Sequence, residues 1–445
     1  MVRLTVVAGW HARIRRRSCR MSVETSPRPR LLMVSRNPPT GVGTGSRIRA
    51  GFFLDTLLQR YDVHLLVISP EADSADLQSP LLARCASLTT DDMAWQSRER
   101  WREPGGDSGA LDFLWHALRA PATNVPVLQH TEGEALVARL PYRDYDAVVA
   151  IRLSMANVAQ QLLDWGLLRA RRRVFDLDDI ESRLLARERA LDGRRTGFAV
   201  GVAKWIRQQR LERTERRLTR TWDQVYVCST ADRDLMHARS RNSTVHCVPN
   251  TCPPTTAAPA SAATAGEILF VGSLRYPPND DAVQFFCEQV WPHLCERLPF
   301  APTLRIVGAG PSIRVKAFAH DPRIDVMGAV ESLDERYRAA ALVIAPIRFG
   351  GGTRIKIIEA LAAGRPVVAT SVGAEGLGLR DGAEILLADA PEAFAAACAK
   401  VLTDAGVWQT LAQQGRAVYE ARFAREIVAE DLLRTLSPLL DDAMS

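Results

Sequence analysis

The chain has 445 residues, which is too long for one ordinary hydrophobic core, so two domains are expected. Its 47% hydrophobic and 24% charged residues are typical of a soluble globular protein, and no apolar run is long enough to span a bilayer. The net charge of +6 permits contact with phosphates or with an anionic membrane surface, but it does not indicate nucleic acid as a partner.

The N-terminal segment 1–26 differs from the rest of the chain in its charge. It lacks the apolar core and small-residue cleavage site of a secretory signal. Two interpretations stay open: a disordered basic extension resting on a membrane, and a translation start at Met21. Both depend on a cluster of five arginines: Arg13, Arg15, Arg16, Arg17 and Arg20.

The first half of the chain opens with the pattern of a doubly wound α/β domain. A buried strand is predicted at 30–35, followed by a glycine loop at 36–45, a helix from about Ser46 to Arg60 and a second strand at 62–68. Further strands are predicted at 147–151, 173–177 and 224–228.

The glycine loop of this first half follows the first strand, so it is expected to face a ligand-binding edge. Gly43, Gly45 and Arg47 are therefore candidates for the phosphate or acceptor side of a site. Glycines also serve tight turns, so a purely structural role for the loop stays open.

An acidic run follows a later strand and offers two interpretations. Asp176, Asp178 and Asp179 include an Asp-x-Asp pattern, which can hold a divalent metal together with a nucleotide. The run lies at a strand end of the first domain, so we expect no required metal. Asp178 and Asp179 are instead predicted to line the acceptor side of a cleft, with helix capping by Asp179 as the alternative.

A basic stretch at 204–220 carries seven lysines and arginines. They spread around a helical wheel and are mixed with Glu212 and Glu215, a pattern that favours a solvated, salt-bridged helix over a membrane-binding stripe.

The eight cysteines of the chain form no Cys-x-x-Cys pair. We therefore expect no zinc site and reduced cysteines in a cytoplasmic protein.

A run of proline, alanine, serine and threonine at 250–265 is predicted to be a linker between the two domains. It would divide a first domain at 27–249 from a second at 266–420, and a C-terminal helix at 421–445 is expected to pack back towards the first domain. Two such domains imply a ligand cleft between them. Strands of the second domain are predicted at 268–271, 304–307, 324–327, 342–345 and 367–370.

The block 349–369 is the most informative part of the sequence. A triple glycine leads into a helix that carries Arg354, Lys356 and Glu359, and the helix is expected to end at Gly364. Helix N-termini expose unpaired N–H groups and positive charge, so a glycine loop at that point admits a phosphate closely. The block therefore predicts recognition of a diphosphate by cations, with a carboxylate in reach of sugar hydroxyls.

Each of these three charged residues also has a structural interpretation. Lys356 and Glu359 are spaced as a surface ion pair, and Arg354 could be a solvated side chain in the first helical turn. The preceding glycines make us favour ligand binding for all three.

Together these motifs resemble the two-domain GT-B glycosyltransferases of the large retaining family that builds bacterial polysaccharides, family four. The resemblance spans nearly all of 30–440. It is carried by the segments 176–181, 270–279, 306–311, 349–369 and 415–423.

The resemblance implies a nucleotide-diphosphate sugar as donor substrate and no further cofactor. Lys356 would bind the diphosphate and Glu359 would hold ribose hydroxyls. Arg354 is a second candidate cation from its place after the glycines, and we assign catalysis to Lys356 and Arg354. The other candidate donor-binding residues are Gly272, Ser273, Gly350, Gly351, Gly352 and Thr353, with Arg275 as a further candidate cation.

Two departures from the family pattern put the donor sugar in doubt. Family members carry a further glutamate eight positions before the one that corresponds to Glu359, where this chain has Gly351. A family arginine and lysine would fall near Ser273 and Asn279, and neither residue is basic.

We expect a metal-independent glycosyltransferase of the hexosyltransferase type, transferring a sugar to a saccharide or lipid-linked acceptor with retention, in synthesis of cell-surface polysaccharide or glycoconjugates. A cytoplasmic location is expected, with peripheral contact to the inner face of the membrane left open. Two alternatives remain: a nucleotide-sugar 2-epimerase of similar fold, and a non-catalytic subunit that binds nucleotide sugars.

Overall fold

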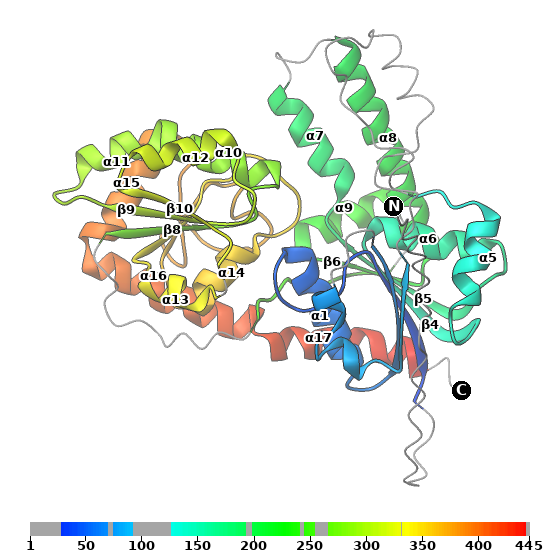
Figure 1. Cartoon of the computed structure of the whole chain (residues 1–445). Helices are drawn as coiled ribbons and strands as arrows, with labels where there is room; N and C mark the ends of the chain where they lie inside the picture. The colour runs from blue at the N-terminus through cyan, green and yellow to red at the C-terminus, as the bar shows by residue number, and fades with distance from the viewer. Residues whose placement is uncertain are drawn as a thin grey trace, which may run out of the picture.

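A computed structural model describes residues 28–69, 74–91, 126–192, 198–240, 244–253, 266–330 and 332–441. These residues form two α/β domains, each built on a parallel sheet with helices on both faces (Figure 1). The fold class expected from the sequence is therefore confirmed. The predictions for 1–26 and for most of the linker, 254–265, lie outside the described residues.

The first domain has a seven-stranded parallel sheet in the order β3-β2-β1-β4-β5-β6-β7. Its strands are β1 (Arg30–Ser35), β2 (Asp62–Ile68), β3 (Ser87–Asp91), β4 (Asp144–Ile151), β5 (Arg169–Asp178), β6 (Gln224–Val227) and β7 (Thr244–Cys247). Its helices are α1 (Gly45–Leu57), α2 (Ser74–Leu77), α5 (His130–Ala138), α6 (Arg152–Asp164), α7 (Glu181–Asp192), α8 (Phe198–Thr221) and α9 (Thr230–Ser240), with a short 3₁₀ turn at Leu82–Arg84.

The second domain repeats this plan with a six-stranded parallel sheet in the order β10-β9-β8-β11-β12-β13. Its strands are β8 (Glu267–Val271), β9 (Thr303–Val307), β10 (Ile324–Gly328), β11 (Leu342–Ala345), β12 (Val367–Ala369) and β13 (Leu386–Leu387). Its helices are α10 (Pro277–Phe285), α11 (Trp291–Arg297), α12 (Ile313–Ala317), α13 (Asp334–Ala339), α14 (Ile355–Ala362), α15 (Pro391–Thr403) and α16 (Ala405–Val418). Single turns of other helix types lie at Phe286–Val290, Phe318–His320 and Tyr419–Phe423.

The last helix, α17 (Arg425–Asp441), returns to the first domain and packs beside α1 (Figure 1). Val428, Leu432 and Leu436 recur every four residues, which places them on one face of the helix. That face is buried in the same core cluster as Met33 and Phe53 of the first domain. The chain thus crosses between the domains twice.

Both sheets present the carboxyl ends of their strands to the region where the domains meet. A Cβ added to Gly45, at the start of α1, would lie 3.3 Å from Ile355 at the start of α14. A Cβ on Gly376 would lie 2.9 Å from the Ser229 side chain, which follows β6. In doubly wound domains ligands bind at this edge of the sheet, so the space between the two edges is the natural place for a site.

A buried arginine joins three parts of the first domain. The Arg49 guanidinium, on α1, donates to both carboxylate oxygens of Asp176 on β5. It also donates to the Val248 carbonyl at 3.0 Å and to Asn250 Oδ1 at 2.9 Å, where the chain leaves the domain. The Arg49 and Asp176 side chains are 1% and 0% exposed, so the ion pair is removed from water.

We predict that Arg49→Ala destabilises the first domain by about 3–5 kcal/mol, because it leaves the Asp176 carboxylate buried without its partner. A loss of that size corresponds to a fall in melting temperature of roughly 10 °C. Thermal unfolding measures it. Arg47→Ala is the matched control on the same helix, because Arg47 pairs with Asp76 at a partly exposed position. Equal melting temperatures for the two variants would contradict the prediction.

Candidate active site between the domains

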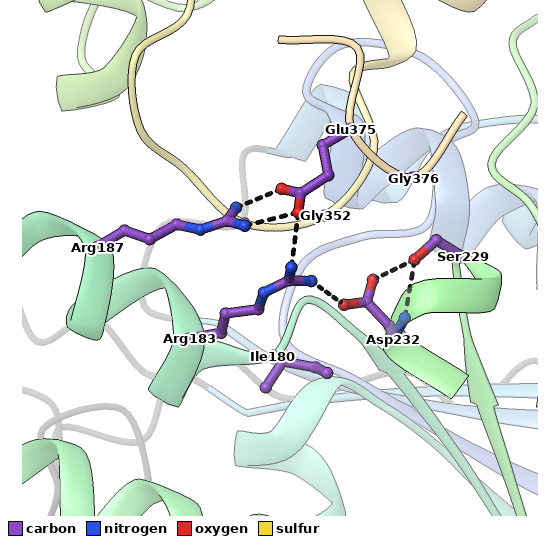
Figure 2. A pocket seen from close by; sticks show the side chains of 9 residues that line it. Ile180, Arg183, Arg187, Ser229, Asp232, Gly352, Glu375 and Gly376 are labelled. Carbon is purple, nitrogen blue, oxygen red and sulfur yellow. Dashed lines mark hydrogen bonds and ion pairs between the residues drawn. The ribbon is translucent and has the colours of Figure 1, made fainter. Parts of the chain in front are cut away.

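A small pocket lies where the carboxyl edges of the two sheets meet (Figure 2). Four elements contribute to it: α7 and the start of α9 from the first domain, and the loops before α14 and after β12 from the second. The residues that line it are Ile180, Arg183, Arg187, Ser229, Asp232, Gly351, Gly352, Glu375 and Gly376. The triple glycine singled out in the sequence is therefore part of the boundary between the domains.

The structure corrects the expected position of Arg354. Helix α14 begins at Ile355, and Arg354 is its N-cap with extended backbone (φ −89°, ψ 98°) rather than a residue of the first turn. Its guanidinium turns back and donates to the Gly351 carbonyl. A Cβ on Gly350 would lie 2.5 Å from this guanidinium, and the backbone of Gly350 (φ 145°) itself favours glycine. The Nε atom of Arg354 is buried without a hydrogen-bond partner.

Lys356 is buried at the start of α14. Its Nζ donates to Asn279 Oδ1 at 2.8 Å and lies 4.1 Å from the centre of the Phe270 ring. Gly272 faces the same atom, because a Cβ on it would come within 2.7 Å of Nζ. Burial, together with the nearby Arg354 cation, lowers the pKa of Lys356 to about 7. A bound anion would stabilise the charged form of this lysine, and the lysine charge would in turn stabilise the bound anion.

Glu359 lies one turn further along α14 and is half-buried. It accepts a hydrogen bond from the Tyr337 hydroxyl of α13 at 2.7 Å. Burial raises the pKa of the Glu359 carboxyl against the opposing effect of this hydrogen bond and of Lys356. Lys356 and Glu359 thus each bond to a different element, Lys356 to α10 and Glu359 to α13, and no Lys356–Glu359 ion pair forms within 4.0 Å in the described part of the chain.

The remaining predicted donor residues lie around this centre. The Ser273 carbonyl accepts from Asn279 Nδ2 at 2.9 Å. Thr353 Oγ1 accepts from Asn250 Nδ2 at 2.9 Å, which joins the glycine loop to the chain leaving the first domain. The Arg275 side chain instead lies over Gly310, because a Cβ there would be 2.3 Å from Arg275 Cγ.

Among the predicted first-domain residues, Gly45 is brought next to α14, as described above. Gly43 has a left-handed backbone (φ 95°), and a Cβ on it would lie 3.7 Å from the Arg47 side chain. Arg47 itself forms an ion pair with Asp76 of α2 at 2.8 Å. The structure therefore brings the start of α1 to the site but directs Arg47 to a partner in its own domain.

The acidic run is held by arginines. Asp178 lies 3.7 Å from Arg49 and 3.5 Å from Arg152, while Asp179 accepts from Arg152 at 3.0 Å. Burial raises the pKa of Asp179 to about 6, and the neighbouring Asp178 charge adds to the rise. No group of three or more histidine, cysteine, aspartate or glutamate side chains suited to a metal ion occurs within the described residues.

A second charged group at the site was not predicted from the sequence. Glu375, after β12, accepts hydrogen bonds from Arg183 at 2.6 Å and from Arg187 at 2.7 Å, both on α7 (Figure 2). Asp232 holds Arg183 at 2.9 Å, and Arg187 also donates to the Gly350 carbonyl at 3.0 Å. The i, i+4 spacing of the two arginines was a visible signal, but nothing local indicated their partner.

Comparisons with known proteins agree with this geometry. Residues 265–404, which make up most of the second domain, match the family described as Glycosyl transferases group 1. A trehalose synthase from Rubrobacter xylanophilus is 35% identical over 114 residues, which are 26% of this chain and 27% of that protein. The matched segment thus spans about a quarter of the curated relative.

Solved structures extend the likeness to both domains. The sucrose-phosphate synthase from Thermosynechococcus elongatus covers 93% of this chain and all of its own, with 16% identity and a TM-score of 0.64. HepE from Anabaena, in complex with UDP and glucose, covers 92% of this chain and all of its own, with 15% identity and a TM-score of 0.58. The arrangement of the two domains is that of the GT-B glycosyltransferases.

Among the described helices, none has the length and apolarity needed to cross a bilayer.

We predict that Glu375→Gln loosens the contact between the domains, because the two α7 arginines lose the carboxylate that joins them to the second domain. The side chains are 26–29% exposed, so we expect an effect of about 1 kcal/mol, roughly a fivefold shift towards an open arrangement. The radius of gyration from small-angle X-ray scattering at low salt measures this shift. Glu420→Gln, which removes an exposed ion pair within the C-terminal part, is the control. Identical scattering from wild type and Glu375→Gln would contradict the prediction.

Proposed function

We propose that this protein is a glycosyltransferase that takes a sugar from a nucleotide-diphosphate donor. The observation that carries the proposal is Lys356, which is buried at the start of α14, just after the triple glycine in the chain, with its Nζ beside Gly272 and a pKa lowered to about 7. A lysine kept this far from water needs an anion to compensate its charge. The diphosphate of a donor placed against the start of α14 supplies that anion.

In the proposed reaction the cations act on the leaving group. Negative charge that develops on the diphosphate as the glycosidic bond breaks is neutralised by Lys356 and Arg354, together with the N–H groups at the start of α14. The orphaned Nε of Arg354 is one donor available for this purpose. Glu359, fixed by Tyr337, accepts hydrogen bonds from the ribose hydroxyls of the nucleotide.

Contact between the domains completes the proposed site. The contacts of α7 with Glu375 and with the Gly350 carbonyl hold the glycine loop against the first domain, which excludes water from the diphosphate. The first-domain edge then supplies the acceptor side, with Asp178 at the end of β5. We propose transfer with retention, without a required metal, to a saccharide or lipid-linked acceptor in the synthesis of polysaccharide or glycoconjugate, on the cytoplasmic side and in peripheral contact with the membrane.

The proposal is tested first by thermal shift with UDP, GDP, ADP, TDP and CMP, each with and without magnesium. Binding to the native state raises the melting temperature, so a shift confined to one diphosphate and unaffected by magnesium identifies the base and supports the proposal. HepE was solved with UDP, so UDP-glucose is the first donor to assay for hydrolysis and transfer. Donor hydrolysis would exclude the non-catalytic subunit. The absence of any shift would contradict the proposal.

We predict that Lys356→Met and Glu359→Gln each weaken binding of the selected nucleoside diphosphate by roughly ten- to hundredfold, because each removes a charged hydrogen-bonding partner. Isothermal titration calorimetry measures the change. Lys400→Met, on α15, is the matched control for charge. Both variants should unfold at or above the wild-type temperature, because each removes a charge that burial disfavours. Wild-type affinity in both folded variants would overturn the site assignment.

The lowered pKa of Lys356 gives a pH dependence with a definite sign. The diphosphate prefers the protonated lysine, so affinity should be full below about pH 7 and should fall above it, by at most about tenfold per pH unit. UDP-glucose is the suitable probe, because its diphosphate carries the same charge throughout this range. Titrations at about pH 6 and about pH 8 test the prediction. Lys356→Arg should abolish the dependence, since arginine stays charged; an unchanged slope in that variant would assign it to another group.

A further inference from the structure

Two residues at the carboxyl edge of the first sheet have an unusual backbone. Arg152, after β4, has φ 75°, and Asp178, at the end of β5, has φ 56°; they are the two non-glycine residues with positive φ in the described part of the chain. Such conformations cost of order 1–3 kcal/mol each and persist where the surroundings fix them. They lie on neighbouring strands and place the Arg152 guanidinium against Asp178 and Asp179.

The Asp179 carboxylate reaches the glycine loop of the other domain. A Cβ added to Gly352, which has φ 63°, would lie 1.8 Å from Asp179 Oδ1, and a Cβ on Gly351 would lie 3.6 Å from its Cγ. Gly352 therefore has to be glycine for the domains to approach. Asp179 stands beside the loop that precedes the start of α14, next to the place proposed for the diphosphate.

The surroundings of Asp179 differ from those of a structural ion pair. Asp176 receives three hydrogen bonds from Arg49, whereas Asp179 receives one, from Arg152. The other groups that face Asp179 are Asp178 and Glu181 of its own segment, Arg354, and Tyr276. Burial raises the pKa of Asp179 to about 6, so it is mostly ionised at neutral pH although its site disfavours the charge. A partly buried carboxylate, 20% exposed, with spare acceptor capacity fits hydroxyl donors.

We propose that Asp179, oriented by Arg152, recognises hydroxyl groups of the sugar carried by the donor, so that the sugar is recognised from the first domain and only when the domains are closed. The nucleotide and diphosphate are held by the second domain, and the sugar lies beyond them towards Asp179. The inference rests on the proposed function. It makes Asp179 a residue that determines sugar specificity, while Asp178 and Asp176 hold the arginines.

The test measures the contribution of the sugar to the binding affinity separately from that of the nucleotide. Titration calorimetry compares UDP with UDP-glucose, GDP with GDP-mannose and ADP with ADP-glucose, on wild type and Asp179→Asn. For the pair that wild type binds, the variant should lose roughly ten- to hundredfold in affinity for the nucleotide sugar and bind the free diphosphate within about twofold. Asp144→Asn, at an exposed ion pair of the same domain, is the control and should match wild type for both ligands.

Two further variants address the same contact from the second domain. Gly352→Ala drives its Cβ into the Asp179 carboxylate and should reproduce the loss for the nucleotide sugar even if Asp179→Asn fails to fold. Gly351→Asp in the Asp179→Asn background should restore part of the affinity, because position 351 has room for a Cβ and adjoins the missing carboxylate.

The binding measurements distinguish failure of this inference from failure of the proposed function. Equal affinities of wild type and Asp179→Asn for the nucleotide sugar would overturn this inference and leave the proposed function standing. Equal losses for the sugar and the free diphosphate would also overturn it, because Asp179 would then act through the closure of the domains alone. If wild type binds none of the six ligands, the proposed function fails and the inference fails with it.

Discussion

The arrangement of the site depends on the buried Arg49 guanidinium. It joins α1 and β5 through Asp176, and it also holds the Val248 carbonyl and Asn250, where the chain leaves the first domain. Asn250 uses its amide oxygen for Arg49 and its amide nitrogen for Thr353 at the end of the glycine loop. One buried charge therefore fixes both the edge of the first sheet and the position of the second-domain loop that faces it. Breaking such a pair leaves an uncompensated charge, which is why the network persists as a unit.

Charge is distributed unequally between the two sides of the cleft. On the first-domain side, Asp176 and Asp178 have arginine partners close by. On the second-domain side, Lys356 has a neutral amide and an aromatic ring as neighbours, and the Arg354 cation nearby acts against its protonation. This excess of positive charge, only partly offset by Glu359, supports the proposed diphosphate donor, whose leaving group gains negative charge in the transition state.

Local sequence patterns were sufficient for the two sheets, and they indicated where a candidate site would lie. Strands such as Asp62–Ile68 are largely apolar and buried after their first residue, and runs of that kind in alternation with helices indicate parallel sheets. The edge strand Ser87–Asp91 was not predicted, because it is polar and partly exposed, and the two-residue strand Leu386–Leu387 is too short to give a pattern. The sequence pattern puts Arg354 inside α14, whereas it is the N-cap, because the triple glycine is a stronger helix-start signal than an arginine at the cap.

The partners of the site residues could not be predicted, since they depend on contacts far apart in the chain. Lys356 meets Asn279 across 77 positions, and Arg187 meets Glu375 across 188. The left-handed backbone of Arg152 and Asp178 could not be predicted from the sequence either. Neither arginine nor aspartate adopts this conformation often enough for the residue type to indicate it.

The triple glycine has a second role, in the contact between the domains, that its sequence pattern does not indicate. Its outer members both have a positive φ, 145° for Gly350 and 63° for Gly352, and Gly352 also lies under the Asp179 carboxylate. Gly351 meets nothing closer than 3.4 Å. The glycines that predicted access for a phosphate are therefore also the surface on which the first domain approaches. A loop without side chains lets a carboxylate of the first domain and the proposed diphosphate site of the second lie next to each other, and a side chain at Gly352 would hold them apart.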